Sequence, residues 1–297
     1  MALLDRLLAP DSKFQKRFFF LAKRFVPGET IADAVATVRD LNRQGMTASL
    51  DFLGEDVRER NAATDTTGVY LKILDALRET GVDSNVSVKL TAIGLLIDES
   101  FALENLLRIA EHARRNADPF VRIDMEGSPV TEATLRVFER AFATDRNVGI
   151  VLQAYLKRTA EDVERAIALG ARVRLCKGAY NEPPAIAYKS MPEIRTNFLR
   201  LAERLLERGT YPGIATHDRR LIAAVRDFAG RRSIARDRFE FQMLHGCRPQ
   251  LQRALVAGGY RMRVYVPFGT HWAGYFYRRV MERRENALFA LSSMFSR

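Results

Sequence analysis

The chain has 297 residues, of which 47 are Lys or Arg and 36 are Asp or Glu, so its formal charge is +11. Hydrophobic residues make up 47% of the sequence and charged residues 28%, which is an ordinary globular composition. This composition excludes a disordered chain, a collagen and a disulfide scaffold. The length is compatible with one domain, because α/β barrels of roughly 250 residues often form one. We expect a single domain over residues 1–297.

The N-terminal segment is basic and apolar. Residues 1–28 carry six basic and two acidic side chains, with 18–20 all phenylalanine, and residues 260–297 carry seven and two. A basic amphipathic helix of this kind suits an anionic membrane surface or RNA. A solvated helix packed on the main domain is the favoured interpretation, and no RNA-binding signature supports the nucleic-acid alternative. We expect residues 1–45 to form a helical extension ahead of the main fold.

From residue 47 onward, short β-branched or apolar runs alternate with helix-like segments, which is typical of repeated βα units and a parallel sheet. The starts of these runs advance by about 31 residues on average, close to the repeat of an eight-stranded barrel. The predicted strands are Thr47–Leu53, Asn85–Leu90, Phe120–Asp124, Val148–Gln153, Arg172–Cys176, Gly213–Thr216, Phe239–Leu244 and Met262–Val266.

Several helix boundaries are marked in the sequence. Ser128 precedes a proline and is expected to cap a helix with its hydroxyl. The run 159–162 resembles a capping box, and Gly170 lies where that helix should end. Within the segment 192–208, apolar residues at spacings of three and four predict one buried stripe. These residues are Ile194, Phe198, Leu201 and Leu205.

The sequence favours a closed (βα)8 barrel over an open doubly wound sheet. It contains neither a G-x-G-x-x-G nor a G-x-x-x-x-G-K-[ST] motif, and it shows no clear switch point between the eight units. We therefore expect a TIM barrel with extra N-terminal helices.

Cysteine usage and hydropathy indicate a cytoplasmic protein. Cys176 and Cys247 lie in apolar or strand-like surroundings and are expected to be reduced, buried thiols. No apolar run approaches the ~18–20 residues of a membrane span. The N-terminus lacks the features of a signal peptide.

The active site of such a barrel forms at the carboxyl ends of its strands. Polar side chains gather at the predicted strand ends, and their clustering is more informative than any one of them, since a single polar residue also serves to cap a barrel rim. These candidates are Lys89, Asp124, Gln153, Arg174, Lys177, Tyr180, Thr216, His217, Gln242, His245 and Tyr265.

A second group follows the last strand. On a helix, Tyr275, Arg278, Arg279 and Glu282 would share one face, because their spacings are three and four. Surface pairing between Arg278 and Glu282 is the simpler explanation. However, two guanidinium groups beside a tyrosine also suit a small carboxylate with an apolar body.

Other chemistries find less support. The four histidines have no metal-ligand spacing and no CxxC is present, so no metal site is expected. No G-x-S-x-G or Cys–His arrangement indicates a nucleophile. A Schiff-base lysine stays open, with Lys89 or Lys177 as the residue. The residues by themselves thus predict a barrel enzyme acting on a small carboxylate.

The sequence resembles the bacterial monofunctional proline dehydrogenases and the corresponding domain of the bifunctional proline utilisation proteins. The resemblance covers roughly residues 25–290, and nine motifs stand in the family's order. They are Asp51–Glu55, Val88–Thr91, Ile123–Glu126, Val151–Tyr155, Arg174–Tyr180, Ala215–His217, Phe239–Gly246, Tyr265–Gly269 and Tyr275–Glu282.

This resemblance implies a distorted (βα)8 barrel that binds FAD without a Rossmann domain. The implied reaction removes a hydride from L-proline and delivers it to flavin N5, giving Δ1-pyrroline-5-carboxylate in the first step of proline catabolism. The reduced flavin would pass its electrons to a membrane quinone. For that step, the basic N- and C-terminal segments would make peripheral contact with the inner face of the membrane.

The resemblance also implies roles in substrate binding. Arg278 and Arg279 would clamp the proline carboxylate, with Lys89 as a further cation. The pyrrolidine ring would lie against Tyr265, Tyr275 and Leu244. Asp124 would pair with Lys89 and set the electrostatics of the site. Glu55, after the first strand, would pair with Arg278 and form a gate over the substrate.

Further residues would hold the cofactor. Arg174 would point at the flavin, where a cation favours the reduced, more negative form. Gly178 would allow the backbone to approach the cofactor closely. The remaining implied FAD contacts are Met125, Gln153, Lys177, Ala179, Thr216, His217 and Glu282.

Two other classes of function stay open at this point. One is a lysine-dependent aldolase on the same barrel. The other is a basic binding module that uses the barrel only as a scaffold.

Overall fold

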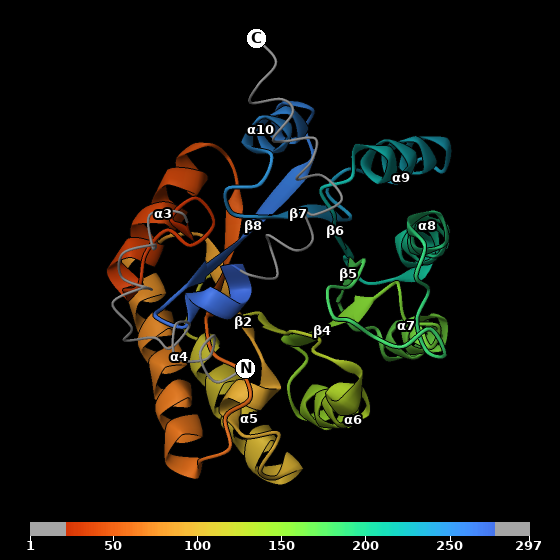
Figure 1. Cartoon of the computed structure of the whole chain (residues 1–297). Coiled ribbons are helices and arrows are strands. Elements are labelled where there is room, and N and C mark those ends of the chain that lie inside the picture. Colours follow the sequence, from red (N-terminus) through yellow and green to blue (C-terminus); the bar gives the residue numbers. More distant parts are fainter. Residues whose placement is uncertain (1–21, 277–297) are drawn as a thin grey trace, which may run out of the picture.

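The computed structural model describes residues 22–276 and contains a closed barrel of eight parallel strands in the order β1 to β8 (Figure 1). The strands are β1 (Thr47–Phe52), β2 (Ser84–Val88), β3 (Val121–Ile123), β4 (Val148–Gln153), β5 (Val173–Cys176), β6 (Gly213–Ala215), β7 (Glu240–Leu244) and β8 (Arg261–Phe268). The helices are α3 (Ile31–Arg43), α4 (Arg60–Thr80), α5 (Glu99–Ala113), α6 (Ser128–Thr144), α7 (Thr159–Leu169), α8 (Met191–Arg208), α9 (Arg219–Arg231) and α10 (Pro249–Ala257).

The closed barrel confirms the predicted fold, and all eight predicted strands are present within two residues of their expected ends. β1 pairs with β8 in parallel from Thr47↔Arg263 to Phe52↔Phe268, which excludes the open sheet. β2 ends two residues early because the chain turns into the 3-10 helix η1 (Leu90–Ile93). α3 lies within the predicted N-terminal extension. Residues 1–21 of that extension fall outside the described range, and with them most of the basic segment over residues 1–28.

Two predicted helix caps are wrong, and the reason is the same for both. Ser128 does not cap α6, because its N–H and its hydroxyl both donate to the carboxylate of Glu182, 2.7 and 2.5 Å away. The hydroxyl of Thr159 donates to the carbonyl oxygen of Gln153 at 2.6 Å instead of closing a capping box on α7. In each case the hydroxyl donates to another acceptor, Glu182 on the loop after β5 or the carbonyl oxygen at the end of β4, and does not cap the helix.

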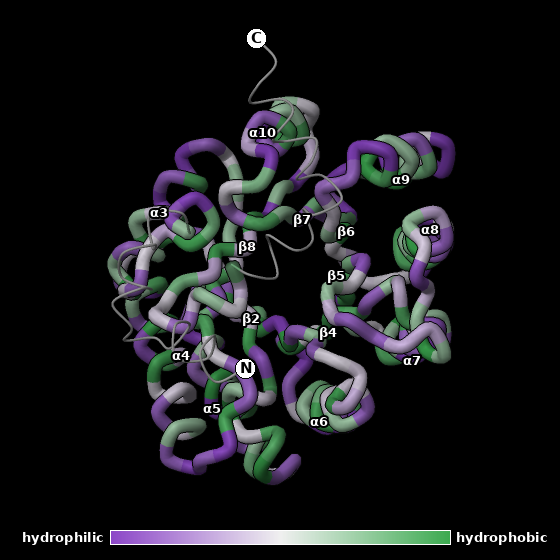
Figure 2. Tube along the Cα trace, viewed as in Figure 1, coloured by the Kyte–Doolittle hydropathy of each residue, from purple (hydrophilic) through white to green (hydrophobic). Residues whose placement is uncertain are grey.

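Other expectations about the helices are confirmed. Gly170 caps the C-terminus of α7 with φ of +74°, a conformation that favours glycine. The predicted stripe on α8 is buried, and this helix begins with a true capping box between Ser190 and Glu193. Figure 2 shows hydrophilic and hydrophobic residues along each helix that rings the barrel, as expected for amphipathic helices packed on a sheet. No helix among residues 22–276 is long and apolar enough to cross a membrane.

The strands alternate between apolar and polar side chains. The apolar positions are buried in the main core between sheet and helices, and they include Leu50, Val86, Val88, Ile123, Ile150, Leu175, Phe241 and Val264. The alternate positions face the barrel interior. Arg174 on β5 demonstrates this, because it reaches Ser87 on β2 and Gln242 on β7 across the barrel. The interior is thus held by hydrogen bonds and ion pairs, where many such barrels use branched apolar residues.

The end of the barrel opposite the expected site is closed by a buried ion pair. The Nε of Arg263 lies 2.9 Å from Oε1 of Glu240, and Glu240 is only 3% exposed. The amide of Gln242 also donates to this oxygen, at 2.5 Å. Glycine makes room for the large side chains, since a Cβ at Gly213 would lie 2.4 Å from the Gln242 amide nitrogen. The charged network at this end therefore depends on the space that Gly213 leaves for Gln242.

We predict that Glu240→Ala destabilises the fold by about 3 kcal/mol, because the buried Arg263 then keeps, among the described residues, a longer ion pair to Asp118 at 3.4 Å and a hydrogen bond to the Ala48 carbonyl. Chemical denaturation monitored by circular dichroism measures this change. Glu99→Ala is the matched control, because it breaks the exposed pair with Arg136 and should have a much smaller effect. Equal free energies of unfolding for the two variants would contradict the assigned role of the pair.

Candidate active site

A buried ion pair lies at the mouth of the barrel, where β1 and β2 end. The Nζ of Lys89 lies 2.9 and 2.8 Å from the two carboxylate oxygens of Asp51. Asp51 is fully buried and Lys89 is 7% exposed. The predicted pair between Lys89 and Asp124 is wrong, because β1 lies next to β2 and places Asp51 beside the lysine.

Asp124 instead organises a second cluster from three strands. Its Oδ1 accepts hydrogen bonds from Arg174, at 2.9 Å, and from the hydroxyl of Ser87, at 3.0 Å. Its Oδ2 accepts the hydroxyl of Tyr265 at 2.7 Å. The Arg174 guanidinium also lies 5.3 Å from the centre of the Tyr265 ring. The structure therefore brings together three residues that the sequence singled out.

Protonation states at this mouth follow from burial and charge. Burial alone would lower the pKa of Lys89, but the carboxylates of Asp51 and Asp124 raise it above its ordinary value. Burial and the same two carboxylates raise the pKa of Tyr265 well above that of a free tyrosine. Lys89 thus stays a cation and Tyr265 stays a hydrogen-bond donor at neutral pH. A cationic, ion-paired lysine is a poor Schiff-base nucleophile.

A small cavity of about 110 Å3 opens beside this ion pair. It contains three of the predicted site residues, Glu55, Lys89 and Tyr275. The rest of its lining is Leu53, Gly54, His271 and Gly274. The cavity thus joins the ends of β1 and β2 to the segment that follows β8.

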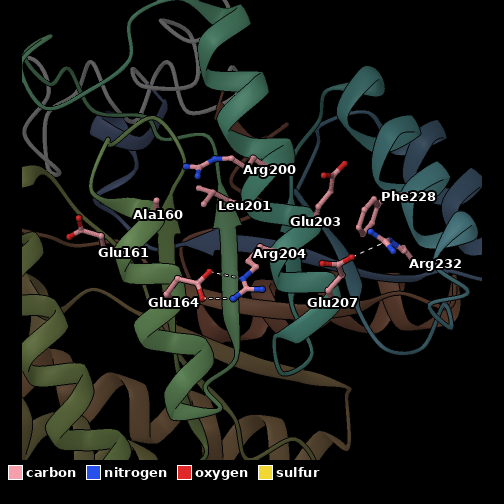
Figure 3. A pocket seen from close by; sticks show the side chains of 10 residues that line it. All are labelled: Ala160, Glu161, Glu164, Arg200, Leu201, Glu203, Arg204, Glu207, Phe228 and Arg232. Atoms are coloured by element: carbon pink, nitrogen blue, oxygen red, sulfur yellow. Dashed lines mark hydrogen bonds and ion pairs between the residues drawn. The ribbon is translucent and has the colours of Figure 1, made fainter.

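A larger groove, of about 600 Å3, lies outside the barrel between α7, α8 and α9 (Figure 3). Four of its seven charged side chains form two ion pairs with one another. The Nε of Arg204 lies 2.6 Å from Glu164, and that of Arg232 lies 3.1 Å from Glu207. All of its lining residues come from these helices and their ends, and none comes from a strand end. We assign the site to the barrel mouth.

An apolar cluster covers the mouth near β7 and β8. It includes Tyr275 and Trp272, with Leu244 and Tyr265 packed against them. Ala22, Phe25 and Val26, from the start of the described chain, complete it. Three residues predicted to wall the substrate ring, Leu244, Tyr265 and Tyr275, therefore share one apolar surface.

Comparison with known proteins decides the family. The model of the proline dehydrogenase family matches residues 34–291. The chain belongs to this family. It is 41% identical over 273 residues to proline dehydrogenase 1 of Bacillus subtilis, covering 92% of this chain and 90% of that protein. It is 37% identical over 285 residues to the proline dehydrogenase of Deinococcus radiodurans, covering 94% and 92%.

A solved structure supports the assignment. The crystal structure of proline utilization A (PutA) from Bdellovibrio bacteriovorus inactivated by N-propargylglycine superposes with a TM-score of 0.82 and 28% identity. The match covers 91% of this chain and 33% of that one. The chain is thus an enzyme of the proline dehydrogenase family, and the predicted resemblance is confirmed.

This family implies a flavin cofactor, and the ends of β4 to β6 offer donors that fit one. Lys177 is 31% exposed on its side chain and lies 4.0 Å from Asp218. The Nε2 of His217 accepts the backbone N–H of Leu244 at 2.9 Å, so the imidazole is neutral and its proton lies on Nδ1. Cys176, Lys177, Ala215 and His217 are all partly exposed. This is a polar, accessible edge beside Arg174.

Other predicted cofactor residues already have structural partners. The amide of Gln153, 2% exposed, donates to the carbonyl oxygen of Glu126 at 2.9 Å. Thr216 Oγ1 accepts the N–H of Asp218 at 3.1 Å. Met125 is buried and Ala179 is exposed.

Gly178 is required for a reason that the sequence does not show. Its φ is +112°, and a Cβ there would lie 2.1 Å from the ring of Tyr155. The protein itself therefore demands glycine at this position, whether or not a cofactor lies against it.

The remaining predicted residues have mixed outcomes. Arg278, Arg279 and Glu282 lie outside the described residues, and so does the predicted contact between Glu55 and Arg278. Cys247 is buried as expected, but Cys176 is only partly buried, so the prediction of two buried thiols is wrong for Cys176. No group of His, Cys, Asp or Glu able to hold a metal occurs between residues 22 and 276.

Sequence reasoning missed Asp51 and Ser87 as members of the site. Each occupies an inward position of a strand whose alternate residues are apolar, Asp51 on β1 and Ser87 on β2. Polar residues at a period of two inside an apolar strand are a usable signal for a polar barrel interior.

Glu126 was also missed, although it lies only three residues after the end of β3. It is 4% exposed, and its two oxygens accept the N–H and the hydroxyl of Thr91 at 3.1 and 2.5 Å. Burial raises its pKa to about 7, against the smaller opposing effects of these hydrogen bonds and of Lys89. Glu126 therefore titrates near neutral pH.

We predict a pH-dependent effect of Glu126 on stability. Because its pKa is higher in the folded chain than in the unfolded one, Glu126 contributes stability that is complete below about pH 4.5 and is lost as the pH rises through 7. From pH 4.5 to 8, the stability of the wild type relative to Glu126→Gln should fall by roughly 3 kcal/mol. Urea denaturation across this range measures the difference. A difference that does not vary with pH would contradict the assignment.

Proposed function

We propose that the protein oxidises L-proline to Δ1-pyrroline-5-carboxylate, with FAD as its cofactor, in the first step of proline catabolism. The observation that carries this proposal is the barrel mouth, where Lys89, Asp124, Arg174 and Tyr265 converge beside an apolar wall. Membership of the proline dehydrogenase family supports the same reaction.

The substrate carboxylate would be recognised by cations. Lys89 lines the small cavity and stays protonated. Asp51 already neutralises much of its charge, so Lys89 alone is a weak anion site. Arg278 and Arg279 would supply the main clamp, because paired guanidinium groups can surround a carboxylate with several charge-assisted bonds.

The substrate ring would lie on the apolar wall of Leu244, Tyr265 and Tyr275. The hydroxyl of Tyr265 is committed to Asp124, so this tyrosine presents its ring to the substrate while its polar tip stays paired. Asp124 holds both Tyr265 and Arg174 in place. The same carboxylate would therefore set the positions of the substrate wall and of the cation that faces the cofactor.

FAD, when bound, would accept the hydride at N5 and pass the electrons to a quinone. Arg174 would hold a positive charge beside the accepting ring. Its guanidinium is fixed by hydrogen bonds to Gln242 on β7, Ser87 on β2 and Asp124 just after β3, so it needs no reorganisation during reaction. The further residues proposed to hold the cofactor are Met125, Gln153, Lys177, Gly178, Ala179, Thr216, His217 and Glu282.

Exclusion of water would involve the loop after β1. Glu55 lines the cavity with Lys89 and Tyr275. We propose that Glu55 pairs with Arg278 over the bound substrate and so closes the site. We also propose a cytoplasmic location, with peripheral membrane contact through the basic ends where a quinone is reached.

Two measurements on purified protein test the proposal. The protein should be yellow, and anaerobic L-proline should bleach its flavin spectrum. Borohydride trapping of a carbonyl substrate on Lys89 or Lys177 would favour the lysine-dependent aldolase instead. Salt-sensitive RNA binding by colourless protein would favour the basic binding module.

We predict that Arg279→Ala or Arg278→Ala raises the KM for proline by about 30-fold to several thousand-fold, because removing one partner of a desolvated charge pair costs roughly 2–5 kcal/mol. The protein should still purify yellow, since most proposed cofactor contacts lie on β3 to β6. Steady-state kinetics measures the effect, and lysine at either position should restore it only in part.

A colourless Arg279→Ala protein would show that the pair serves the cofactor or the fold. A near-normal KM in both alanine variants would place the carboxylate site elsewhere.

A further inference from the structure

Thr91 joins three loops at the barrel mouth. Its hydroxyl accepts the N–H of Asp56 at 3.0 Å, and its carbonyl oxygen accepts the N–H of Val57 at 3.1 Å. Both amides belong to the loop between β1 and α4. On its other side, Thr91 binds the carboxylate of Glu126, which follows β3. We call Thr91, the Glu126 side chain and these two amides the Thr91 clamp.

The direction of each hydrogen bond in the clamp follows from the donors available. Because the Thr91 hydroxyl accepts the N–H of Asp56, its own hydrogen is free to point at Glu126, 2.5 Å away. The other Glu126 oxygen accepts the N–H of Thr91. An ionised Glu126 satisfies both donors at once. Donation to an anion also makes the Thr91 oxygen a better acceptor for Asp56.

The clamped loop forms part of the site. Its first residues, Leu53, Gly54 and Glu55, line the cavity with Lys89. The clamp grips the loop at Asp56, which has φ of +60°, a conformation that costs a non-glycine residue energy. A backbone held there needs fixed partners, and within the described chain Thr91 supplies two of them.

The charges around Glu126 come from two neighbouring elements. Lys89, at the end of β2, favours its ionised form, whereas Glu55, on the loop after β1, opposes it. Asp56 adds a further acidic group on that loop, and from β4 the neutral Gln153 donates to the Glu126 carbonyl. Burial keeps the pKa of Glu126 near 7, so ionisation occurs in the neutral range.

We propose that Glu126 is a positioning residue that acts through Thr91 to hold the β1–α4 loop against the substrate cavity, more firmly when its carboxylate is ionised. Glu126 itself does not line the cavity. When Glu126 is protonated, its acid hydrogen competes with the Thr91 hydroxyl for the same contact. The loop then loses part of its anchor, and the cavity wall loosens. The consequence for substrate binding rests on the proposed function, but the clamp itself does not.

Amide hydrogen exchange on the full-length holoenzyme tests the clamp. Protection of Asp56 and Val57, corrected for the intrinsic rate at each pH, should rise about 2- to 10-fold between pH 5.5 and 8.5 in the wild type. Glu126→Gln should abolish this rise. Thr91→Val removes the acceptor of the Asp56 N–H and should leave that amide weakly protected at every pH, whereas the Val57 amide keeps the backbone carbonyl of residue 91 as its acceptor. Thr91→Ser keeps the hydroxyl and should resemble the wild type.

Glu79→Gln, at the exposed far end of α4, is the control for charge alone and should retain the rise. Unchanged protection of the Asp56 amide in Thr91→Val, or a pH dependence that persists in Glu126→Gln, would overturn the proposal. Glu126→Gln and Thr91→Ser keep the test valid if Thr91→Val does not fold.

Proline kinetics extends the test to the site. Glu126→Gln should raise the KM for proline by about 2- to 10-fold at pH 8.5 and leave it nearly unchanged at pH 5.5, with a smaller effect on kcat. A KM that responds equally at both pH values would indicate a merely structural role and would contradict the proposal. If the wild type does not oxidise proline, the proposed function fails, whereas the exchange result still decides the clamp.

Discussion

The arrangement of this protein depends on a guanidinium group buried inside its barrel. Arg174 is 6% exposed and rises from β5 into the interior. A buried cation is costly unless it is paired and hydrogen-bonded. Here the partners come from other strands, with Asp124 on the side of β3 and Gln242 on β7 as the strongest. The barrel interior must therefore be polar.

This requirement extends along the whole barrel. The amide of Gln242 accepts a hydrogen bond from Arg174 and donates one to Glu240, and Glu240 in turn pairs with Arg263 at the far end. One connected network thus links the site to the closed end. The apolar faces of the same strands point outward against the helices, so the core that stabilises the fold lies outside the barrel. The barrel interior can therefore hold charged side chains in fixed positions.

The same organisation gives the mouth a fixed part, made of paired cations, and an adjustable part, made of a loop. Lys89 and Arg174 are cations whose charges are offset within the protein, by Asp51 and Asp124. Their positions are set by neighbouring strands and do not depend on a ligand. Preorganised charge of this kind lowers the cost of reaction, because little has to move when charge develops. The loop after β1 supplies the adjustable part of the wall.

Much of the fold followed from the sequence because its signals are local. β4 matches its predicted bounds, since a run of apolar residues between polar turns is visible in the chain itself. The partner of Lys89 was not predictable in the same way. Asp51 lies 38 residues away and becomes its neighbour only through strand pairing. The acceptor of the Ser128 hydroxyl, Glu182, lies 54 residues away and is likewise set by a tertiary contact.

The candidate site was predicted in outline for a similar reason. The rule that barrel sites form at strand ends selected Asp124, Arg174 and Tyr265, and the structure brings them within hydrogen-bonding distance. It could not select Glu126, whose importance comes from burial and from Thr91 on another loop. Burial of a single carboxyl group depends on packing that a linear pattern does not contain.

The central claim is that Asp124 organises the reaction site by fixing Arg174 and Tyr265. The most direct test is the rate constant of flavin reduction by L-proline, measured by anaerobic stopped flow, in Asp124→Asn. Asparagine keeps the shape but removes the charge that both partners bind. Because a hydrogen bond to a charged group contributes about 1.5–3 kcal/mol, the rate constant should fall roughly 10- to 150-fold in protein that stays folded and yellow. An unchanged rate constant in folded, yellow protein would contradict the account.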